Sequence, residues 1–279
     1  MPKRILITGG SSYLGQHLLP LACKQYQVLY TYFHHKPPTA PTDGRPLDLR
    51  DFEAVGRLVS AWQPEAIIHL AGSDRSEDMS AVICQGAENI VQAAQGVNAR
   101  LIHLSTDVLF DGRHGPYTES SPPSPIHPYG EAKAAAESIV AAYANHVIVR
   151  TSLIYSLTVM DYATRWLVSA LESGKAVTLF DDQFRNPVWT DTLSWACLEL
   201  VELDFRGILN VAGSQVLNRA EFGMRMLDWW NVQERATLST GPSPATWPKD
   251  CRLDVSLAGQ VLLTNMAGVD TVLAAHNSS

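Results

Sequence analysis

The sequence predicts an α/β fold, with a doubly wound parallel sheet followed by a smaller C-terminal lobe. Three observations support this prediction. The first two thirds of the chain alternate short β-rich runs with longer helical stretches, a glycine-rich turn follows the first run, and the alternation loosens after Arg150. A chain of 279 residues with 46% hydrophobic content can bury the core that such a fold requires.

Short apolar and β-branched runs predict strands over residues 5–8, 28–32, 66–70, 101–105 and 146–150. Apolar spacing predicts helices between them, over residues 14–24, 51–62, 81–95 and 129–143. A further short strand is expected just before Asp48. Because helices follow strands in turn, the order is that of βαβ units in one parallel sheet.

Beyond Arg150 the pattern predicts helices over 162–173, 191–203 and 221–229, strands over 176–180 and 208–211, a loop over 240–248 and a capping helix near the C-terminus. We expect residues 1–153 to form the Rossmann domain, which residues 187–211 rejoin. Residues 154–186 and 212–279 are then expected to form the substrate-binding lobe.

Composition argues against several classes of partner. A net charge of -7 and a pI near 5.7 give no basic field for nucleic acid or an anionic membrane. The four cysteines are scattered without a close pair, which is typical of reduced thiols in a cytoplasmic protein and indicates neither disulfides nor zinc. The histidines are scattered as well, so no metal site is expected. The first residues are too short an apolar run for a signal peptide or a membrane span.

The turn after the first strand indicates a dinucleotide site, because a pyrophosphate can sit against backbone N–H groups at the start of the next helix. Ser12 stands where the usual pattern has its middle glycine. Its side chain either crowds the pyrophosphate or supplies a hydroxyl ligand, and a positive φ there would cost about 1 kcal/mol. A glycine turn without a ligand is the alternative interpretation. The expected cofactor contacts of this region are Gly9, Ser11, Ser12, Tyr13, Leu14, Gly15, Ala71 and Gly72.

The end of the second strand carries no carboxylate that would bind a ribose 2′-hydroxyl and favour NAD. His34, His35 and Lys36 stand there instead and could face a 2′-phosphate, which favours NADP, with NAD still open. The alternative is a solvated basic loop. Asp48, followed by Leu49, is expected to meet the adenine edge.

Tyr129 and Lys133 indicate hydride-transfer chemistry, because residues four apart on a helix share one face. A free tyrosine has a pKa near ~10, and an adjacent ammonium lowers it toward the range of a useful proton donor. Ser105 and Thr106 end the preceding strand, and both Ser105 and the Tyr-Lys pair are expected to contact the cofactor. Asp107 either caps that turn or contacts substrate, and the cap is the favoured interpretation.

Six segments carry a family resemblance: 105–112, 116–119, 128–133, 149–152, 182–187 and 247–254. Through them the chain resembles the extended short-chain dehydrogenase/reductases, and among these the dTDP-4-dehydrorhamnose reductase branch. The resemblance implies NADPH-dependent reduction of a nucleotide-linked 4-keto-6-deoxy sugar. It also implies that Tyr129 donates a proton to the C4 carbonyl oxygen, that Lys133 holds the nicotinamide ribose, and that Thr106 polarises the carbonyl.

The chain departs from the branch at three positions. Val108 stands where the family usually has Tyr, Leu153 where it has Trp, and Ile83 where it has Asn at the start of a helix. Lost aromatic rings predict weaker or altered sugar-nucleotide recognition. Arg185 is expected to pair with a diphosphate oxygen. The expected substrate contacts are Ser105, Thr106, Asp107, Val108, Tyr129, Leu153 and Arg185.

Two other functions stay open at this point. One is a non-catalytic NADP-binding regulatory subunit that resembles the β subunit of methionine adenosyltransferase. The other is a sugar-nucleotide epimerase or dehydratase of the same superfamily. Trp229 and Trp230 either form a hydrophobic seam to a second subunit, as in a homodimer, or pack on the core of their own chain.

Overall fold

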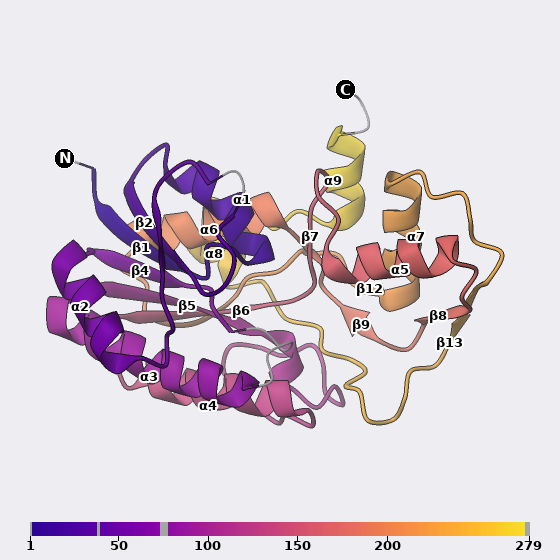
Figure 1. Ribbon diagram of the computed structural model, residues 1–279. Helices are drawn as coiled ribbons and strands as arrows, with labels where there is room; N and C mark the ends of the chain where they lie inside the picture. Colours follow the sequence, from indigo (N-terminus) through magenta and orange to yellow (C-terminus); the bar gives the residue numbers. More distant parts are fainter. Residues whose placement is uncertain (1, 38–39, 73–77, 277–279) are drawn as a thin grey trace.

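The computed structural model describes residues 2–37, 40–72 and 78–276, and within them seven strands form one sheet in the order β11-β6-β5-β4-β1-β2-β3 (Figure 1). Every pairing in this sheet is parallel. The strands are β1 (Arg4–Thr8), β2 (Gln27–Tyr32), β3 (Gly44–Pro46), β4 (Ala66–His69), β5 (Arg100–Thr106), β6 (His146–Thr151) and β11 (Gly207–Asn210). The strand order reverses beside β1, and ligands of open parallel sheets bind at such a reversal.

Helices cover both faces of the sheet (Figure 1). One face packs on α1 (Tyr13–Ala22), α6 (Thr190–Glu202) and α8 (Ala258–Val261), and the other on α2 (Phe52–Trp62), α3 (Met79–Val97) and α4 (Pro128–Ala141). Alternate strand residues divide between the two layers: Ile5 and Ile7 belong to the first core and Leu6 to the second. The doubly wound α/β fold is therefore confirmed.

The smaller lobe lies at one end of the sheet (Figure 1). It contains the helices α5 (Tyr162–Glu172), α7 (Arg219–Trp229) and α9 (Val269–His276). Short strands pair beside them: β7 (Ile154–Tyr155) with β10 (Val188–Trp189), β9 (Phe184–Arg185) with β12 (Leu217–Asn218), and β8 (Val177–Phe180) with β13 (Leu238–Gly241). Tyr155, Phe222 and Met226 lie in a hydrophobic core of this lobe that is separate from the two cores of the sheet.

Side-chain caps explain where several helices begin. Asp51 accepts a hydrogen bond from the backbone N–H of Ala54 at the start of α2, and Asp161 caps α5 in the same way. Asn218 and Glu221 form a reciprocal capping box on α7. These caps account for helices that start within a residue or two of the predicted positions.

The expected elements are present with small shifts at their ends, and the loop predicted over 240–248 begins inside β13. Ala258, Leu262 and Met266, expected in the small lobe, pack in the core beneath α1 and α6. We propose the division into a Rossmann domain and a substrate lobe as predicted, with this segment returning to the sheet. Among the described residues no helix is long and apolar enough to cross a membrane.

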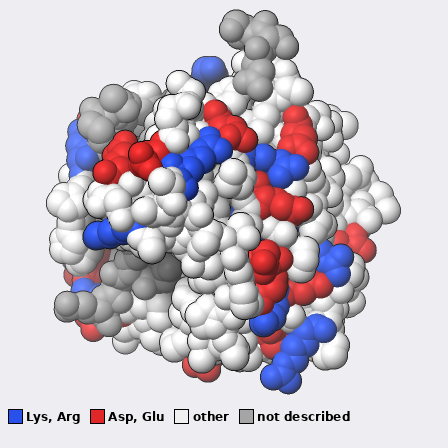
Figure 2. Space-filling view, turned by 90° about the vertical axis from the view of Figure 1, so that its right-hand side faces the viewer, with Lys and Arg blue, Asp and Glu red and all other residues white. Residues whose placement is uncertain are grey.

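The surface at the small-lobe end carries basic and acidic side chains that lie interspersed (Figure 2). Within this lobe the Nε of Arg225 on α7 lies 2.6 Å from Oδ1 of Asp270 on α9, and Nη1 of Arg235 lies 2.7 Å from Oδ1 of Asp228. Charges on this face are therefore neutralised locally by neighbours of opposite sign.

Candidate active site

The glycine turn lies at the carboxyl end of β1, where the strand order reverses. Gly9 has a φ of +70°, and a Cβ there would lie 2.9 Å from the backbone nitrogen of Ala71. A Cβ on Gly15 would lie 2.5 Å from the carbonyl oxygen of Gly9. The close approach of the turn, α1 and the end of β4 therefore requires glycine at both positions.

Ser12 avoids the strain that a positive φ would impose, because its φ is -65° and its backbone is extended. Its hydroxyl accepts a hydrogen bond from the backbone N–H of Gly15 at 3.1 Å and caps α1. The hydroxyl thus satisfies one of the first N–H groups of the helix. Ser12 is therefore the N-cap of α1, and the cost of a positive φ does not arise.

A cavity of about 850 Å³ opens beside this turn and the ends of β2 and β4. Of the expected cofactor residues it is lined by Gly9, Ser11, Ser12, His34, His35, Asp48, Leu49, Ala71 and Gly72. Tyr13, Leu14 and Gly15 lie outside its wall, and the Tyr13 hydroxyl donates to the carbonyl of Val159 at 2.7 Å. The volume lies in the range of small-molecule and cofactor sites, so the cavity fits the adenosine half of a dinucleotide.

Basic groups stand at one side of the cavity. His34 and His35 line it, whereas Lys36 is exposed outside its wall. Arg50, which the sequence argument missed, lines it too and lies 5.8 Å from the ring centroid of Phe33. Asp48 also lines the cavity, where its Oδ2 accepts a hydrogen bond from Nη2 of Arg50 at 2.8 Å. The order Asp-Leu-Arg, which begins two residues after the third strand, is the signal that could have revealed this arginine.

Tyr129 and Lys133 lie in the first two turns of α4, as predicted. His127 caps this helix, its Nδ1 accepting from the backbone N–H of Tyr129 at 3.2 Å. A Cβ on Gly130 would lie 2.3 Å from the carbonyl oxygen of Val108, so only glycine allows α4 to approach the segment after β5 this closely. This contact brings Tyr129 to the end of the strand that carries Ser105 and Thr106.

Lys133 is buried, and its Nζ donates to the carbonyl oxygen of Leu104 at 2.6 Å. The same atom lies 3.4 Å from Nε2 of His103, a contact that sequence reasoning missed. Burial lowers the pKa of Lys133 to about 8, and the negative charge of Glu137 opposes that shift. The lysine therefore changes charge close to neutral pH.

Ser105 and Thr106 differ in their contacts. Ser105 is buried, and its hydroxyl has no partner among the described residues. The hydroxyl of Thr106 accepts from the backbone N–H of Val108 at 3.4 Å and lies 3.5 Å from Oδ1 of Asp107. A buried hydroxyl without a partner is costly unless a ligand supplies one, so Ser105 is suited to contact a bound molecule.

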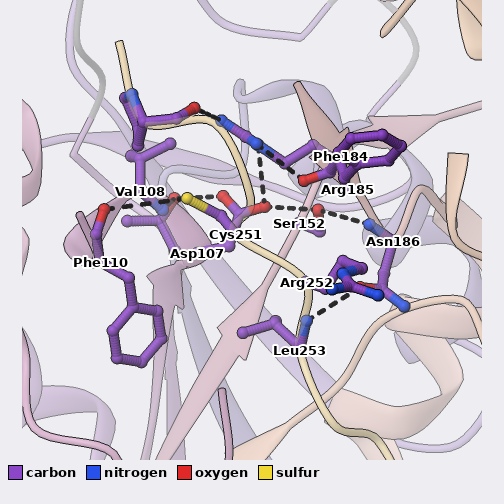
Figure 3. Close-up of polar contacts among 12 residues, drawn as sticks. Asp107, Val108, Phe110, Ser152, Phe184, Arg185, Asn186, Cys251, Arg252 and Leu253 are labelled. Carbon is purple, nitrogen blue, oxygen red and sulfur yellow. Dashed lines mark hydrogen bonds and ion pairs between the residues drawn. The ribbon is translucent and has the colours of Figure 1, made fainter. Parts of the chain in front are cut away.

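Asp107 connects the end of β5 with the small lobe (Figure 3). Its Oδ2 accepts from the Ser152 hydroxyl at 2.5 Å and lies 3.5 Å from Nε of Arg185. Burial raises the pKa of Asp107, while Arg185 and Ser152 lower it. Asp107 therefore acts as a link between lobes, and the favoured interpretation of a cap is corrected, because the cap of this turn is Thr106.

Arg185 is placed differently from the prediction (Figure 3). It is buried, and its terminal nitrogens donate to the backbone carbonyls of Phe184, Pro248 and Lys249 at 2.7–2.8 Å. With these carbonyls and Asp107 as partners, the guanidinium is engaged by the protein itself. The expected pairing with a diphosphate is corrected to a structural role.

A second cavity of about 250 Å³ lies in the small lobe beside this network, and Leu153, Trp166 and Arg219 contribute to its wall. The guanidinium of Arg219 makes no hydrogen bond to any described residue. Burial lowers the pKa of Arg219, the positive charge of Arg185 adds to that shift, and Asp161 and Asp107 oppose it. Arg219, which the sequence argument did not select, is thus the basic group that this cavity offers to a ligand.

The remaining predicted residues have simpler surroundings. Ile83 is buried against Gly72, and a Cβ added at Gly72 would lie 3.0 Å from Cγ1 of Ile83. Trp229 and Trp230 pack on the hydrophobic clusters of the small lobe, and the Trp229 indole donates to the carbonyl of Leu157 at 3.1 Å. Of the two interpretations of this pair, packing on the chain's own core is the one that the structure supports.

The sheet, the glycine turn and the Tyr-Lys pair together define an extended short-chain dehydrogenase/reductase. More narrowly, the chain belongs to the family described as the RmlD substrate binding domain, whose model matches residues 3–275. The resemblance inferred from the sequence is confirmed by this match.

Named relatives agree with that membership. A dTDP-4-dehydrorhamnose reductase of Sinorhizobium fredii is 32% identical, with 90% of this chain and 88% of that protein covered. The methionine adenosyltransferase 2 subunit beta of Rattus norvegicus is 26% identical over 91% of this chain and 81% of its own length. The crystal structure of a hypothetical dTDP-4-dehydrorhamnose reductase from Sulfolobus tokodaii has a TM-score of 0.83 and 28% identity, covering 97% of this chain and 98% of that one.

Proposed function

We propose that this chain is an NADPH-dependent reductase that acts on the 4-keto group of a nucleotide-linked 4-keto-6-deoxy sugar. One observation carries the proposal: α4 carries Tyr129 and Lys133, and Lys133 donates to the carbonyl of Leu104 on β5, next to Ser105, whose hydroxyl has no partner in the described part of the chain. Family membership and the reductase from S. fredii support the same chemistry.

The residues present fit a dinucleotide. The turn at Gly9 leaves no room for a Cβ, and the adjoining cavity is large enough for an adenosine. Lys133 is not part of the cavity wall and would hold the nicotinamide ribose. Ser12 caps α1, whose N-terminus would face the pyrophosphate. His34, His35 and Arg50 would hold a 2′-phosphate, which favours NADP over NAD.

When bound, the cofactor supplies a hydride to the carbonyl carbon. Tyr129 would donate a proton to the carbonyl oxygen, and Thr106 would polarise the same oxygen from the end of β5. The positive charge of Lys133 lowers the pKa of a neighbouring phenol and orients the nicotinamide ribose. Tyr129 and Thr106 would thus act on the carbonyl oxygen, and Lys133 on the phenol and the ribose.

The sugar nucleotide is proposed to occupy the cavity beside the Asp107 link. Leu153 gives it an apolar wall in place of the usual Trp, and Arg219 replaces Arg185 as the partner of a diphosphate. With a smaller aromatic contribution than in the family pattern, the site is expected to be substrate-selective. A cytoplasmic location belongs to the proposal, and the four free cysteines support it.

A panel of 4-keto sugar nucleotides tests the proposal, with NADPH consumption followed by absorbance. We expect turnover with at least one member and none in the Tyr129→Phe variant. A regulatory role is the second candidate function, and it is favoured by Val108 and Leu153, which stand where the family usually has aromatic residues. If NADPH binds, no member of the panel is reduced and a protein partner co-purifies, the regulatory role replaces ours. Interconversion of sugar stereoisomers without net NADPH consumption would indicate an epimerase.

A further inference from the structure

Three polar side chains lie side by side across the sheet behind Lys133. Thr8, His69 and His103 are register partners on β1, β4 and β5, and all three are buried. Each lies two residues after a strand residue of the core under α2, α3 and α4, namely Leu6, Ile67 and Leu101, so all three face that layer. A polar row in this otherwise apolar face calls for a reason.

The row is connected by close contacts. The Thr8 hydroxyl lies 2.6 Å from Nδ1 of His69, and the rings of His69 and His103 have centroids 5.1 Å apart. Nε2 of His103 then lies 3.4 Å from Nζ of Lys133. Chain segments that are distant in sequence are thereby joined from the cofactor turn to the catalytic helix.

The direction of the last hydrogen bond follows from the chemistry of the two groups. An ammonium has three N–H donors and no acceptor, so Nε2 of His103 must accept, and the ring proton lies on Nδ1. That Nδ1 has no partner among the described residues. Burial, reinforced by the charge of Lys133, holds the pKa of His103 well below its ordinary value and that of His69 at about 3. Both rings are therefore neutral near pH 7.

Two of the three donors of Lys133 are fixed by the protein, one by the Leu104 carbonyl and one by His103. The geometry of a tetrahedral ammonium then fixes the direction of the third. We infer that His103 is a positioning residue whose neutral imidazole, supported by His69 and Thr8, directs the free N–H of Lys133 to the nicotinamide ribose. This inference rests on the proposed function, because it concerns the same reaction.

Other groups around Lys133 must be considered before its pH dependence is assigned to His103. Glu137 on α4 and Cys84 on α3 raise the pKa of Lys133, and Tyr129 lies one turn away. Glu137 is itself paired with Arg150 of β6, whose Nη2 lies 2.8 Å from Oε2 of Glu137. A change at His103 leaves that ion pair in place, so its effect can be measured separately.

The main experiment measures NADPH affinity by calorimetry between pH 6 and 9.5. In the wild-type protein the affinity should fall as the pH rises through the pKa of Lys133, which is about 8. In His103→Leu the midpoint should move to lower pH by about one unit, because the ammonium loses an acceptor in a dry site. In His103→Gln the midpoint should return, since a Gln carbonyl oxygen can accept at the position of Nε2.

Two controls separate positioning from packing. In a Lys133→Met background, His103→Leu should cause no further loss of affinity, which a double-mutant cycle measures. Ile148→Val alters the residue paired with His103 on β6 and should leave the midpoint unchanged. An unshifted midpoint in His103→Leu would refute the inference. So would a loss of NADPH affinity on His103→Leu that is equally large in the Lys133→Met background.

The apoprotein gives a reading that does not depend on the cofactor. The difference in stability between wild type and Lys133→Met changes over a certain pH range. The same comparison made in the His103→Leu background should show this change at lower pH. If NADPH fails to bind the wild-type protein at any pH, the proposed function is rejected, and this apoprotein titration still decides the role of His103. If NADPH binds but neither midpoint depends on His103, only the inference is rejected.

Discussion

Arg185 and Asp107 form a buried ion pair, with Nε of the arginine 3.5 Å from Oδ2 of the aspartate. The pair ties the end of β5 to the small lobe, because the guanidinium also donates to the backbone carbonyls of Pro248 and Lys249. Motion of the small lobe relative to Thr106 is therefore restricted at the point where substrate and catalytic strand would meet.

Arg185→Met should lower stability strongly. The change leaves the Asp107 carboxylate buried without its cation and several carbonyls without donors, and such losses cost on the order of 3 kcal/mol or more. Urea unfolding followed by circular dichroism measures it. Arg219→Met is the matched control and should change the unfolding free energy little, because Arg219 makes no hydrogen bond to the described residues. Equal stability of the two variants would contradict the assignment.

Arg219→Ala should raise the Michaelis constant for the sugar nucleotide by about 10-fold and change kcat much less. A diphosphate contact is made equally in the ground and transition states, so its loss weakens binding without slowing chemistry. Steady-state kinetics at saturating NADPH provide the measurement. A fall in kcat with an unchanged Michaelis constant would place Arg219 outside the substrate site.

Tyr129→Phe should reduce kcat by about 100-fold or more, because general acid catalysis supplies factors of that size. The ring is retained, so the affinity for NADPH should stay within about twofold of wild type. Stopped-flow hydride transfer and calorimetric titration provide the two numbers. Turnover at the wild-type rate in this variant would remove Tyr129 from the mechanism.

Arg50→Gln should weaken the binding of NADPH more than that of NADH, so the difference between the two affinities should become smaller. Arg50 keeps one N–H on each terminal nitrogen beyond those engaged by Asp48 and Asp78 among the described residues. Lys36→Gln is the control and should have little effect, since Lys36 is exposed outside the cavity wall. If Lys36→Gln changed the preference for NADPH over NADH and Arg50→Gln did not, the 2′-phosphate would contact Lys36 and not Arg50.

Lys133→Met should make the apoprotein more stable at pH 7. The pKa of Lys133 is lowered from 10.5 to about 8 on folding, so between these values the unfolded chain binds more protons and stability rises with pH. The full penalty of ~3 kcal/mol at most is present below pH 8. The stability difference between variant and wild type should therefore shrink as the pH rises from 8 to 10.5, which thermal unfolding at several pH values tests. A constant difference would mean that Lys133 titrates normally.

Local sequence determined the elements and the positions of the main proposed catalytic residues. The periodicity of 129–143 predicted α4, and helical spacing alone placed Tyr129 and Lys133 on one face. The glycines after β1 predicted the turn because only glycine tolerates the φ of Gly9 and the close approach at Gly15. Such features depend on neighbours in the chain, so the chain by itself indicates them.

Partners of long side chains were decided by the tertiary structure. Arg185 looked like a ligand for a diphosphate, yet the fold surrounds it with Asp107 and with the carbonyls of Pro248 and Lys249, which are 63 and 64 residues away in the chain. Arg219 carried no local signal for a cavity, and His103 meets Lys133 only because β5 lies beneath α4. A flexible cationic side chain reaches whichever acceptor the packed elements bring near, and only the assembled fold specifies that acceptor.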